Sequence, residues 1–374
     1  MVTKKKIIMG LARKSIIFKP FILKKMYQCS NEIRKKVINE TIDTYTNKHN
    51  LSSAEKKYFK NDMSYCRAHY NLSFKEYFLF GFKNKNHFQR KKFIINRDRQ
   101  NYLYLLGQIE GQQTLNDKYK TYELLKKFYK RDMIKIGVND YKDFENFVHK
   151  HNQFVKKPIS SSFGSGIELI DFSEYDSIKD MFNYILRDGE VILEERIIQC
   201  KETASLHPES LNTLRIVTYR DEKDNVFIHL PFIKVGQGSS FVDNGGDGGI
   251  LAMIDPETGI IITDGKDETN IVYEFHPDTN IRFKGFQIPK WQEVINVAKK
   301  AALAFDKTRY IGWDVAINDK GEVVIVEGNG KTQFLGQQIP DEIGKKKQLE
   351  KLINYKRLKN KNKNIKKWEL PVNE

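Results

Sequence analysis

Two apolar stretches within residues 310–329, one containing an acid and the other followed by one, constrain the fold of this chain more than any other segment. Residues 311–317 and 323–326 are apolar and rich in β-branched side chains, which favour strands. Between them, Asn318-Asp-Lys-Gly321 has the composition of a tight turn. The segment therefore predicts a β-hairpin with one acid inside its first strand and another at the end of its second.

Asp314, Glu327 and Asn329 are expected to converge on one face of this hairpin. A turn centred in that tetrapeptide places Asp314 opposite Glu327, and the two-residue period of a strand puts Asn329 on the same face. Gly312 and Ala316 are small and leave room beside Asp314. Carboxylate and amide oxygens suit Mg²⁺, which predicts a metal site. The alternative is an exposed polar sheet face, but buried carboxylates in apolar strands need partners.

Composition indicates a globular chain of 374 residues, 40% of them hydrophobic, with room for two or three domains. Its cysteines are odd in number and far apart, which predicts neither a disulfide framework nor a zinc site: Cys29, Cys66 and Cys200. No apolar run reaches the roughly 18 residues of a membrane-spanning helix. We therefore expect a cytoplasmic protein in a reducing compartment.

The net charge of +16 is concentrated at the two ends of the chain. Residues 1–50 carry +9 and residues 341–374 carry +6, which leaves +1 for residues 51–340. A basic nucleic-acid-binding core is therefore not predicted, and no nucleic-acid partner is expected. The basic ends suit anionic lipid at the inner face of the cell membrane or a polyanionic glycan, and a solvated tail is the alternative.

A loop of small residues, Ser160–Gly166, lies between predicted strands at 153–159 and 167–170. Glycine lets backbone N–H groups approach phosphates closely, and Lys157 on the preceding strand can reach the same phosphates. Lys156 takes this role instead if the register of the strand is shifted by one residue. The loop is not a Walker motif, which needs Gly-Lys-Ser/Thr and a following helix, and a plain hairpin loop is the alternative.

Four further strands are expected, at 191–198, 212–219, 225–235 and 250–254. Alternation along the strand at 212–219 puts Arg215 on the face opposite Leu214 and Ile216. Lys234 lies near the end of the strand at 225–235. The glycine-rich loop 236–249 joins the last two strands. A long loop between strands is more often functional than decorative.

Helical patterns surround the predicted strands. Capping-box sequences begin at Ser52 and Ser73, and Lys118 stands at the start of an amphipathic helix. Residues 291–305 carry an apolar stripe at helical spacing. This stripe predicts a core helix that packs on the sheet just before the 310–329 hairpin.

In chain order, these features resemble the ATP-grasp superfamily of ATP-dependent carboxylate–amine ligases. Residues 207–338 are especially similar to the sugar-transfer-associated ATP-grasp family, which is linked to bacterial polysaccharide synthesis. The resemblance covers roughly residues 60–340. The segments that carry it are His207-Pro-Glu-Ser-Leu-Asn-Thr-Leu-Arg-Ile-Val-Thr218, Val242-Asp-Asn-Gly245, Gly248-Gly249, His276-Pro-Asp-Thr279, Ile311-Gly-Trp-Asp314 and Val326-Glu-Gly-Asn329.

The resemblance implies an α+β ATP-grasp fold, in which two α+β subdomains grip ATP between antiparallel sheets, with a helical N-terminal region. It divides the chain into a basic, mostly helical region (1–100), a lid subdomain with the glycine loop (101–200), a metal-binding subdomain (201–340) and a basic helical tail (341–374). The predicted hairpin then belongs to the metal-binding subdomain.

The resemblance also implies a nucleotide site. In the family, two lysines hold the phosphates, the glycine loop lies over them, the strand that links the subdomains takes the adenine, and a later acid holds the ribose. The matching residues are Lys118 and Lys157; Ser162, Gly164 and Gly166; Glu194, Glu195 and Ile197; and Glu202. Asp314, Glu327 and Asn329 match the ligands of two Mg²⁺ ions.

An arginine near the transferred phosphoryl group is a further implication. Some members place it two residues before the metal-binding Asp, where this chain has Gly312. Arg215 instead resembles the arginine of glutamate-ligase-like members, and we expect Arg215 and Lys234 to be catalytic. The expected substrate-binding residues are Asn212, Asp243 and Asn244.

The resulting hypothesis is an ATP-grasp ligase that forms an amide through an acyl phosphate, with ATP and two Mg²⁺ ions. By resemblance, its substrates are a sugar acid or amino sugar and an amino acid or other amine, in capsule or O-antigen synthesis. Two alternatives stay open. One is a kinase of a sugar or glycan hydroxyl on the same scaffold, and the other is an inactive scaffold in a glycosyltransferase complex.

Overall fold

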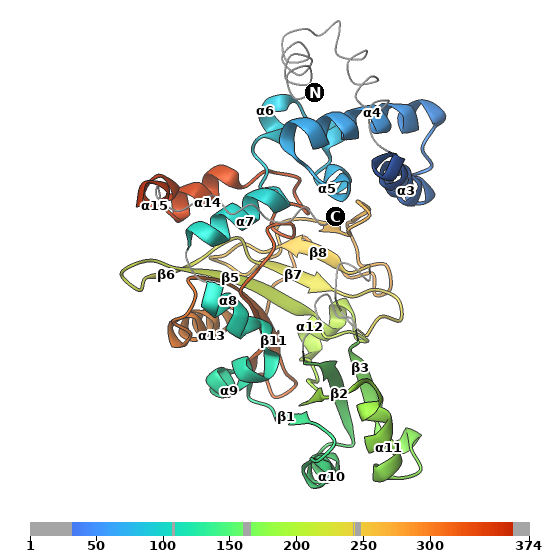
Figure 1. Cartoon of the computed structure of the whole chain (residues 1–374), viewed down its shortest axis with the longest axis vertical. Helices are drawn as coiled ribbons and strands as arrows, with labels where there is room; N and C mark the ends of the chain where they lie inside the picture. The colour runs from blue at the N-terminus through green and yellow to red at the C-terminus, as the bar shows by residue number, and fades with distance from the viewer. Residues whose placement is uncertain (1–31, 107–108, 160–165, 242, 244–247, 362–374) are drawn as a thin grey trace, which may run out of the picture.

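The computed structural model describes residues 32–106, 109–159, 166–241, 243 and 248–361. These residues form a four-stranded and an eight-stranded antiparallel sheet with helices packed around both (Figure 1). The predicted α+β fold with a helical N-terminal region is confirmed. Within these ranges, no helix combines the length and the hydrophobicity that crossing a bilayer requires.

The four-stranded sheet, called the small sheet here, has the strand order β1-β4-β2-β3. Its strands are β1 (Met133–Ile136), β2 (Gln153–Pro158), β3 (Glu168–Asp171) and β4 (Val191–Glu195). Apolar side chains of α10 (Tyr141–Lys150) and α11 (Ile178–Ile185) share a core with this sheet, centred on Phe144, Phe154 and Met181. The strands predicted around the glycine loop and before residue 198 are confirmed, although the last ends at Glu195.

The eight-stranded sheet, called the large sheet here, has the order β10-β9-β8-β7-β5-β11-β12, with β6 paired to β5. Its strands are β5 (Thr213–Arg220), β6 (Val226–Ile228), β7 (Phe232–Val235), β8 (Ile250–Met253), β9 (Gly265–Lys266), β10 (Val272–Tyr273), β11 (Tyr310–Ile317) and β12 (Val323–Asn329). α13 (Trp291–Ala304) packs against it through the predicted stripe, whose residues are buried. The core helix and the hairpin are therefore confirmed.

The prediction of a single strand at residues 225–235 is wrong. Leu230 adopts a left-handed conformation with φ of 49°, and Pro231 after it has no N–H group to donate. The ladder therefore breaks into β6, which pairs with the end of β5, and β7, which pairs with its beginning. In this arrangement Lys234 lies directly opposite Thr213.

Helices of the N-terminal region pack on the far side of the large sheet from the small sheet (Figure 1). The capping boxes at Ser52 and Ser73 are confirmed at the starts of α4 and α5. Phe232, Leu251 and Met253 of the large sheet belong to the same apolar core as these helices. The helices are α3 (Glu32–His49), α4 (Ser53–Tyr70), α5 (Phe74–Leu79), α6 (His87–Arg90) and α7 (Asn96–Leu105).

The remaining helices flank the two sheets. α8 (Ile109–Asn116) and α9 (Lys118–Tyr129) contact β12, and α9 also contacts β1, so this pair bridges the large and small sheets. α12 (Lys201–Leu206) precedes β5, and the C-terminal segment contributes α14 (Lys346–Leu352) and α15 (Tyr355–Lys361).

Candidate active site

A cavity of about 840 Å³ lies between the two sheets. On the side of the small sheet it is lined by Lys118, Lys157 and Glu194. On the side of the large sheet it is lined by Arg215, Lys234, Asp243, Asp314, Glu327 and Asn329. Side chains that the sequence places far apart thus face one space, and most of them are charged.

The hairpin formed by β11 and β12 brings two acids and an amide together, as its sequence predicts. Asp314 pairs with Glu327 and Gly312 pairs with Asn329 across the two strands, with a bulge after Asp314. The side-chain Nδ2 of Asn329 donates to Glu327 Oε1 (3.0 Å) and to Asp314 Oδ2 (3.4 Å). These three side chains therefore form one polar cluster at the cavity wall.

Asp314 is buried between two cations from neighbouring strands. Arg215 Nε and Nη2 donate to its two carboxylate oxygens at 2.6 and 2.9 Å, and Lys234 Nζ lies 3.3 Å from Oδ2. Burial acts to raise the pKa of Asp314, but these two cations outweigh it and lower that pKa. Asp314 is therefore ionised, and the fork of Arg215 is fixed at the cavity wall.

Gly312 explains where the arginine of this site comes from. A Cβ atom at Gly312 would lie 2.4 Å from Thr332 Oγ1 and 3.1 Å from Arg215 Cδ. The space beside the hairpin is thus filled first by Thr332 and then by the stem of Arg215. A side chain at position 312, arginine included, does not fit beside these two residues.

Asp243 is a second buried carboxylate beside Lys234, with Oδ1 3.5 Å from the ammonium nitrogen. Its Oδ2 accepts a hydrogen bond from the backbone N–H of Thr213 (2.9 Å), and the Thr213 hydroxyl donates to the same oxygen. Burial raises the pKa of Asp243; Lys234 opposes that shift, and the nearby charge of Asp314 adds to it. The environment thus moves the pKa values of Asp243 and Asp314 in opposite directions.

Glu194 at the end of β4 is the corresponding carboxylate on the small-sheet side. Its Oε2 accepts from Lys157 Nζ (2.8 Å) and Arg131 Nη2 (3.1 Å). Burial acts to raise the pKa of Glu194, but the two cations outweigh it and lower that pKa. Arg131 also donates to the carbonyls of Ile325 (2.7 Å) and Val326 (3.0 Å) on β12. This arginine therefore ties the small sheet to the β11–β12 hairpin.

Sequence reasoning missed Arg131, because a lone arginine between a helix and a strand belongs to no recognisable pattern. It also placed Glu194 at the adenine, whereas the carboxylate is committed to Lys157 and Arg131. Apolar side chains that line the cavity nearby offer a better surface for a base: Met133, Val155, Ile197, Ile198 and Val326.

The lysines are placed as their strand and helix positions predict. Lys157 lines the cavity, whereas Lys156 points to the other face of β2 and pairs with Glu168 (2.9 Å). Lys118 begins α9 after the capping residue Asp117. Burial, and then the like charge of Lys157, lower the pKa of Lys118 against the attraction of nearby carboxylates.

Three of the predicted site residues that the structure describes do not line the cavity: Glu202, Asn212 and Gly166. Glu202 is exposed on α12 and does not line the cavity, which counts against the predicted contact with a ribose; Glu209 is an acid that does line the cavity. The Asn212 side chain is buried, and its Nδ2 donates to the carbonyls of Thr203 (2.9 Å) and His207 (2.8 Å). Asn212 therefore holds the chain before β5 and has no free group for a substrate.

Other predicted residues divide between the described and undescribed parts of the chain. Glu195 and Ile197 line the cavity, although the Glu195 carboxylate accepts the backbone N–H of Asp132 (3.0 Å). Gly166 is exposed and has a φ of 77°, a conformation that favours glycine. The roles predicted for Ser162, Gly164 and Asn244 fall on residues that lie outside the described ranges.

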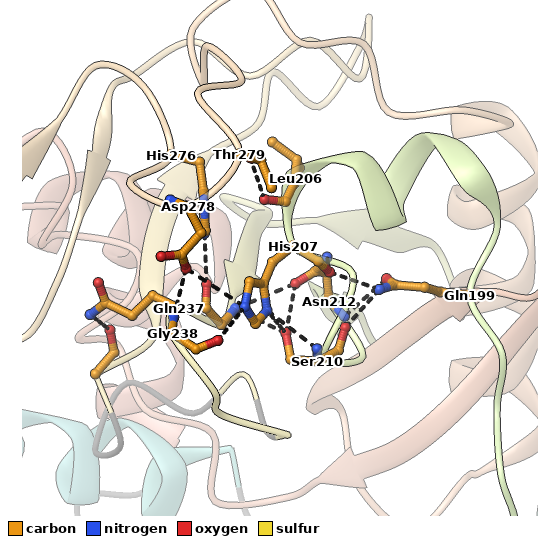
Figure 2. A network of polar contacts seen from close by, with 12 residues as sticks. Gln199, Leu206, His207, Ser210, Asn212, Gln237, Gly238, His276, Asp278 and Thr279 are labelled. Carbon is orange, nitrogen blue, oxygen red and sulfur yellow. Dashed lines mark hydrogen bonds and ion pairs between the residues drawn. The ribbon is translucent and has the colours of Figure 1, made fainter.

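Two buried histidines hold the first residues of the glycine-rich loop 236–249 (Figure 2). His207 Nε2 lies 2.9 Å from the carbonyl of Gly238, and His276 Nε2 lies 2.8 Å from the carbonyl of Gly236. Since a carbonyl can only accept, each Nε2 carries the proton and donates. The two histidine motifs noted in the sequence thus anchor the loop that carries Asp243.

Two antiparallel sheets enclose a cavity that is lined by two lysines, Lys118 and Lys157, and by a cluster of two acids and an amide. This arrangement is that of an ATP-grasp protein. The profile described as sugar-transfer associated ATP-grasp matches residues 97–354, and the chain belongs to that family. No match was found among curated proteins.

Solved structures with similar folds include ligases of several kinds. The ATP-grasp ligase PsnB complexed with minimal precursor is 13% identical, with a TM-score of 0.39, and the match covers 63% of this chain and 58% of that one. Carboxyaminoimidazole ribonucleotide synthase from Aspergillus clavatus, complexed with ATP, is 15% identical, with a TM-score of 0.36 and coverages of 58% and 45%. The L-amino acid ligase from Bacillus licheniformis is 11% identical, with a TM-score of 0.38 and coverages of 63% and 44%. The chain thus spans roughly half the length of these proteins, and likeness at this level carries no argument about activity.

Proposed function

We propose that this protein is an ATP-dependent carboxylate–amine ligase. A substrate carboxylate oxygen attacks the γ-phosphorus of ATP, and ADP leaves with the electron pair of the broken P–O bond. The amine nitrogen then attacks the acyl carbon of the acyl phosphate, phosphate leaves, and the amine loses a proton. The observation that carries the proposal is the bidentate contact of Arg215 with Asp314, within a cluster that Glu327 and Asn329 complete.

The chain's own residues supply positive charge that stabilises the phosphate groups in this reaction. Lys118 and Lys157 suit the nucleotide phosphates at one side of the cavity, and Arg215 and Lys234 suit the transferred phosphoryl group at the other. Asp243 has a raised pKa beside Lys234, which suits a group that takes the proton released by the amine.

The donor set of Asp314, Glu327 and Asn329 fits Mg²⁺, because it offers carboxylate oxygens and an amide oxygen on one face. Asn329 turns its Nδ2 toward the acids, and a rotation of the amide presents Oδ1 instead. Two Mg²⁺ ions bound there would offset charge on the phosphate oxygens.

The substrates are proposed from the family description, sugar-transfer associated. A sugar acid or amino sugar and an amino acid or other amine, joined during capsule or O-antigen polysaccharide synthesis, suit a cavity that combines cations with apolar side chains. The basic C-terminal segment suits peripheral contact with an anionic membrane, where glycosyltransferase partners work. Co-sedimentation with anionic and neutral vesicles, for the full chain and a chain ending near residue 344, tests that contact.

ADP release measured with and without a panel of amines tests the ligase reaction. A ligase needs the amine for turnover, and with hydroxylamine it yields a hydroxamate from the acyl phosphate. A kinase instead yields a stable phosphoester without an amine. Absence of any Mg-ATP binding would contradict both reactions and favour the inactive scaffold.

A further inference from the structure

The wall of the cavity also includes a residue of α7, a helix that lies on the side of the large sheet away from the small sheet (Figure 1). There it is lined by Arg99 of α7, Lys331, and the apolar side chains of Phe232, Leu251 and Leu335. None of these residues is needed by the nucleotide or by the metal cluster. The far side of the cavity therefore offers room for a part of the substrate that does not react.

Arg99 carries a charge that its neighbours do not compensate. Its Nη1 donates to the backbone carbonyl of Lys331 (3.2 Å), and its Nε is buried without a hydrogen-bond partner. Burial lowers the pKa of Arg99, and the charge of Glu76 offsets this only in part. Among the described residues, no carboxylate forms an ion pair with Arg99. The Arg99 side chain is half-buried, with its Nε fully buried, and its guanidinium in this state gains free energy from an anion that enters the cavity.

Other charges at this side of the cavity do not change that balance. Glu268 lines the cavity, but it forms an ion pair with Lys75. Lys331 is exposed and adds a second positive charge beside Arg99. Glu76, the acid whose charge reaches Arg99, accepts the backbone N–H groups of Asn96 (2.6 Å) and Ser73 (2.9 Å). The local excess of charge is therefore positive.

Arg99 is also linked directly to the reacting side of the site. The carbonyl that it contacts belongs to Lys331, and the next residue, Thr332, accepts a hydrogen bond from Arg215 Nη1 (3.3 Å). Both arginines are thus held by one short segment that follows the predicted metal ligand Asn329. Because both arginines line the same cavity, a substrate with two anionic groups suits this arrangement.

We propose that Arg99 forms a second anion-binding subsite, which selects substrates that carry another anionic group besides the reacting carboxylate. The shared chemistry is a small carbon skeleton with two anionic groups, the second being either a carboxylate or a phosphate. The skeleton packs on Phe232, Leu251 and Leu335. This inference rests on the proposed ligase function, because it takes the carboxylate at Arg215 as the reacting group.

Calorimetric titration in the presence of Mg²⁺ and a non-hydrolysable ATP analogue tests the subsite with two pairs of probes. The phosphate pair is glucuronate 1-phosphate and methyl glucuronide, which carries a methoxy group in place of the phosphate. The carboxylate pair is glutarate and butyrate. We expect the wild type to bind the doubly anionic member of at least one pair about tenfold more tightly, as a charge-assisted hydrogen bond allows. The pair that shows the preference identifies the second group.

Arg99→Gln should remove that preference, and Arg99→Lys should weaken it. Arg97→Gln is the matched control, because Arg97 is exposed on the same helix and does not line the cavity. Equal wild-type affinities within both pairs, or a preference that survives Arg99→Gln, would overturn the subsite. Titration of the ATP analogue in the same series separates the two proposals: failure to bind it counts against the ligase function, whereas binding without an Arg99-dependent preference counts only against the subsite.

Discussion

Two buried carboxylates line the same cavity, and each is held between two cations. Asp314 accepts hydrogen bonds from Arg215 and Lys234, which lie on neighbouring strands of the large sheet, so all three groups belong to one sheet. Glu194 accepts hydrogen bonds from Lys157, which lies on the same sheet, and from Arg131. Arg131 also donates to two backbone carbonyls of β12. Similar local chemistry therefore serves two purposes: the first cluster fixes charge within one sheet, and the second joins the two sheets.

The surroundings of the two clusters also differ. Asp314 shares its wall with Glu327 and lies near Asp243, so the negative charge there exceeds what one arginine and one lysine neutralise. Glu194 is a single carboxylate hydrogen-bonded to two cations, so positive charge exceeds negative charge in that cluster. The first cluster can therefore accept further positive charge, as a metal site must, whereas the second gains most from an anion.

The largest expected effect is the loss of turnover in Glu327→Gln. Removing one charge from the metal cluster should cost about 4 kcal/mol of transition-state stabilisation, which lowers turnover about a thousandfold. Steady-state ADP release at saturating Mg²⁺ measures it. The control is Glu322→Gln, at the exposed turn of the same hairpin, which should keep wild-type turnover. Activity within about tenfold of wild type would show that Glu327 is not a metal ligand.

Arg215→Lys should reduce turnover about a hundredfold while ATP affinity stays within about threefold. An ammonium cannot grip both oxygens of a carboxylate or a phosphoryl group as a guanidinium does. Arg220→Lys is the control, because Arg220 lies on the same strand and contacts the carbonyl of Asp306 outside the cavity. If ATP affinity falls in parallel with turnover, Arg215 serves nucleotide binding and the reacting side of the site is misassigned.

Lys157→Ala should weaken ATP binding about tenfold or more, whereas Lys156→Ala should change it little. The two lysines are neighbours on β2, but only Lys157 lines the cavity and Lys156 pairs with Glu168 on the other face. Titration of both variants with an ATP analogue measures the difference, and each variant is the other's control. Equal small losses would remove the small sheet from phosphate binding.

Glu194→Gln should lower the free energy of unfolding by about 2 kcal/mol, because it leaves Lys157 and Arg131 buried without a carboxylate. Asp314→Asn should cost less, because Asp243 and Glu327 still face Arg215 and Lys234. Urea unfolding of both variants at neutral pH provides the comparison. A larger loss in Asp314→Asn would mean that the large-sheet cluster, and not the link between the sheets, contributes more to stability.

The sequence by itself determined the hairpin, its register and the faces of its strands. Alternation along a strand is local, so Asp314, Glu327 and Lys157 could be placed on their faces without knowledge of the fold. The apolar period of residues 291–305 likewise determined a core helix. Placement of these side chains in a nucleotide site came from the resemblance, not from the residues alone.

Only the tertiary structure decided which groups meet across the cavity. Arg131 finds Glu194 and the carbonyls of β12 because two sheets approach each other, and no local period records that approach. Glu202 had the right chemistry for a ribose, but α12 turns it to solvent. The anchoring of the glycine-rich loop by His207 and His276 depends on the same long-range packing. The two-residue period of a strand fixes the face on which a side chain lies, whereas the partners of that side chain depend on which distant segments pack against that face.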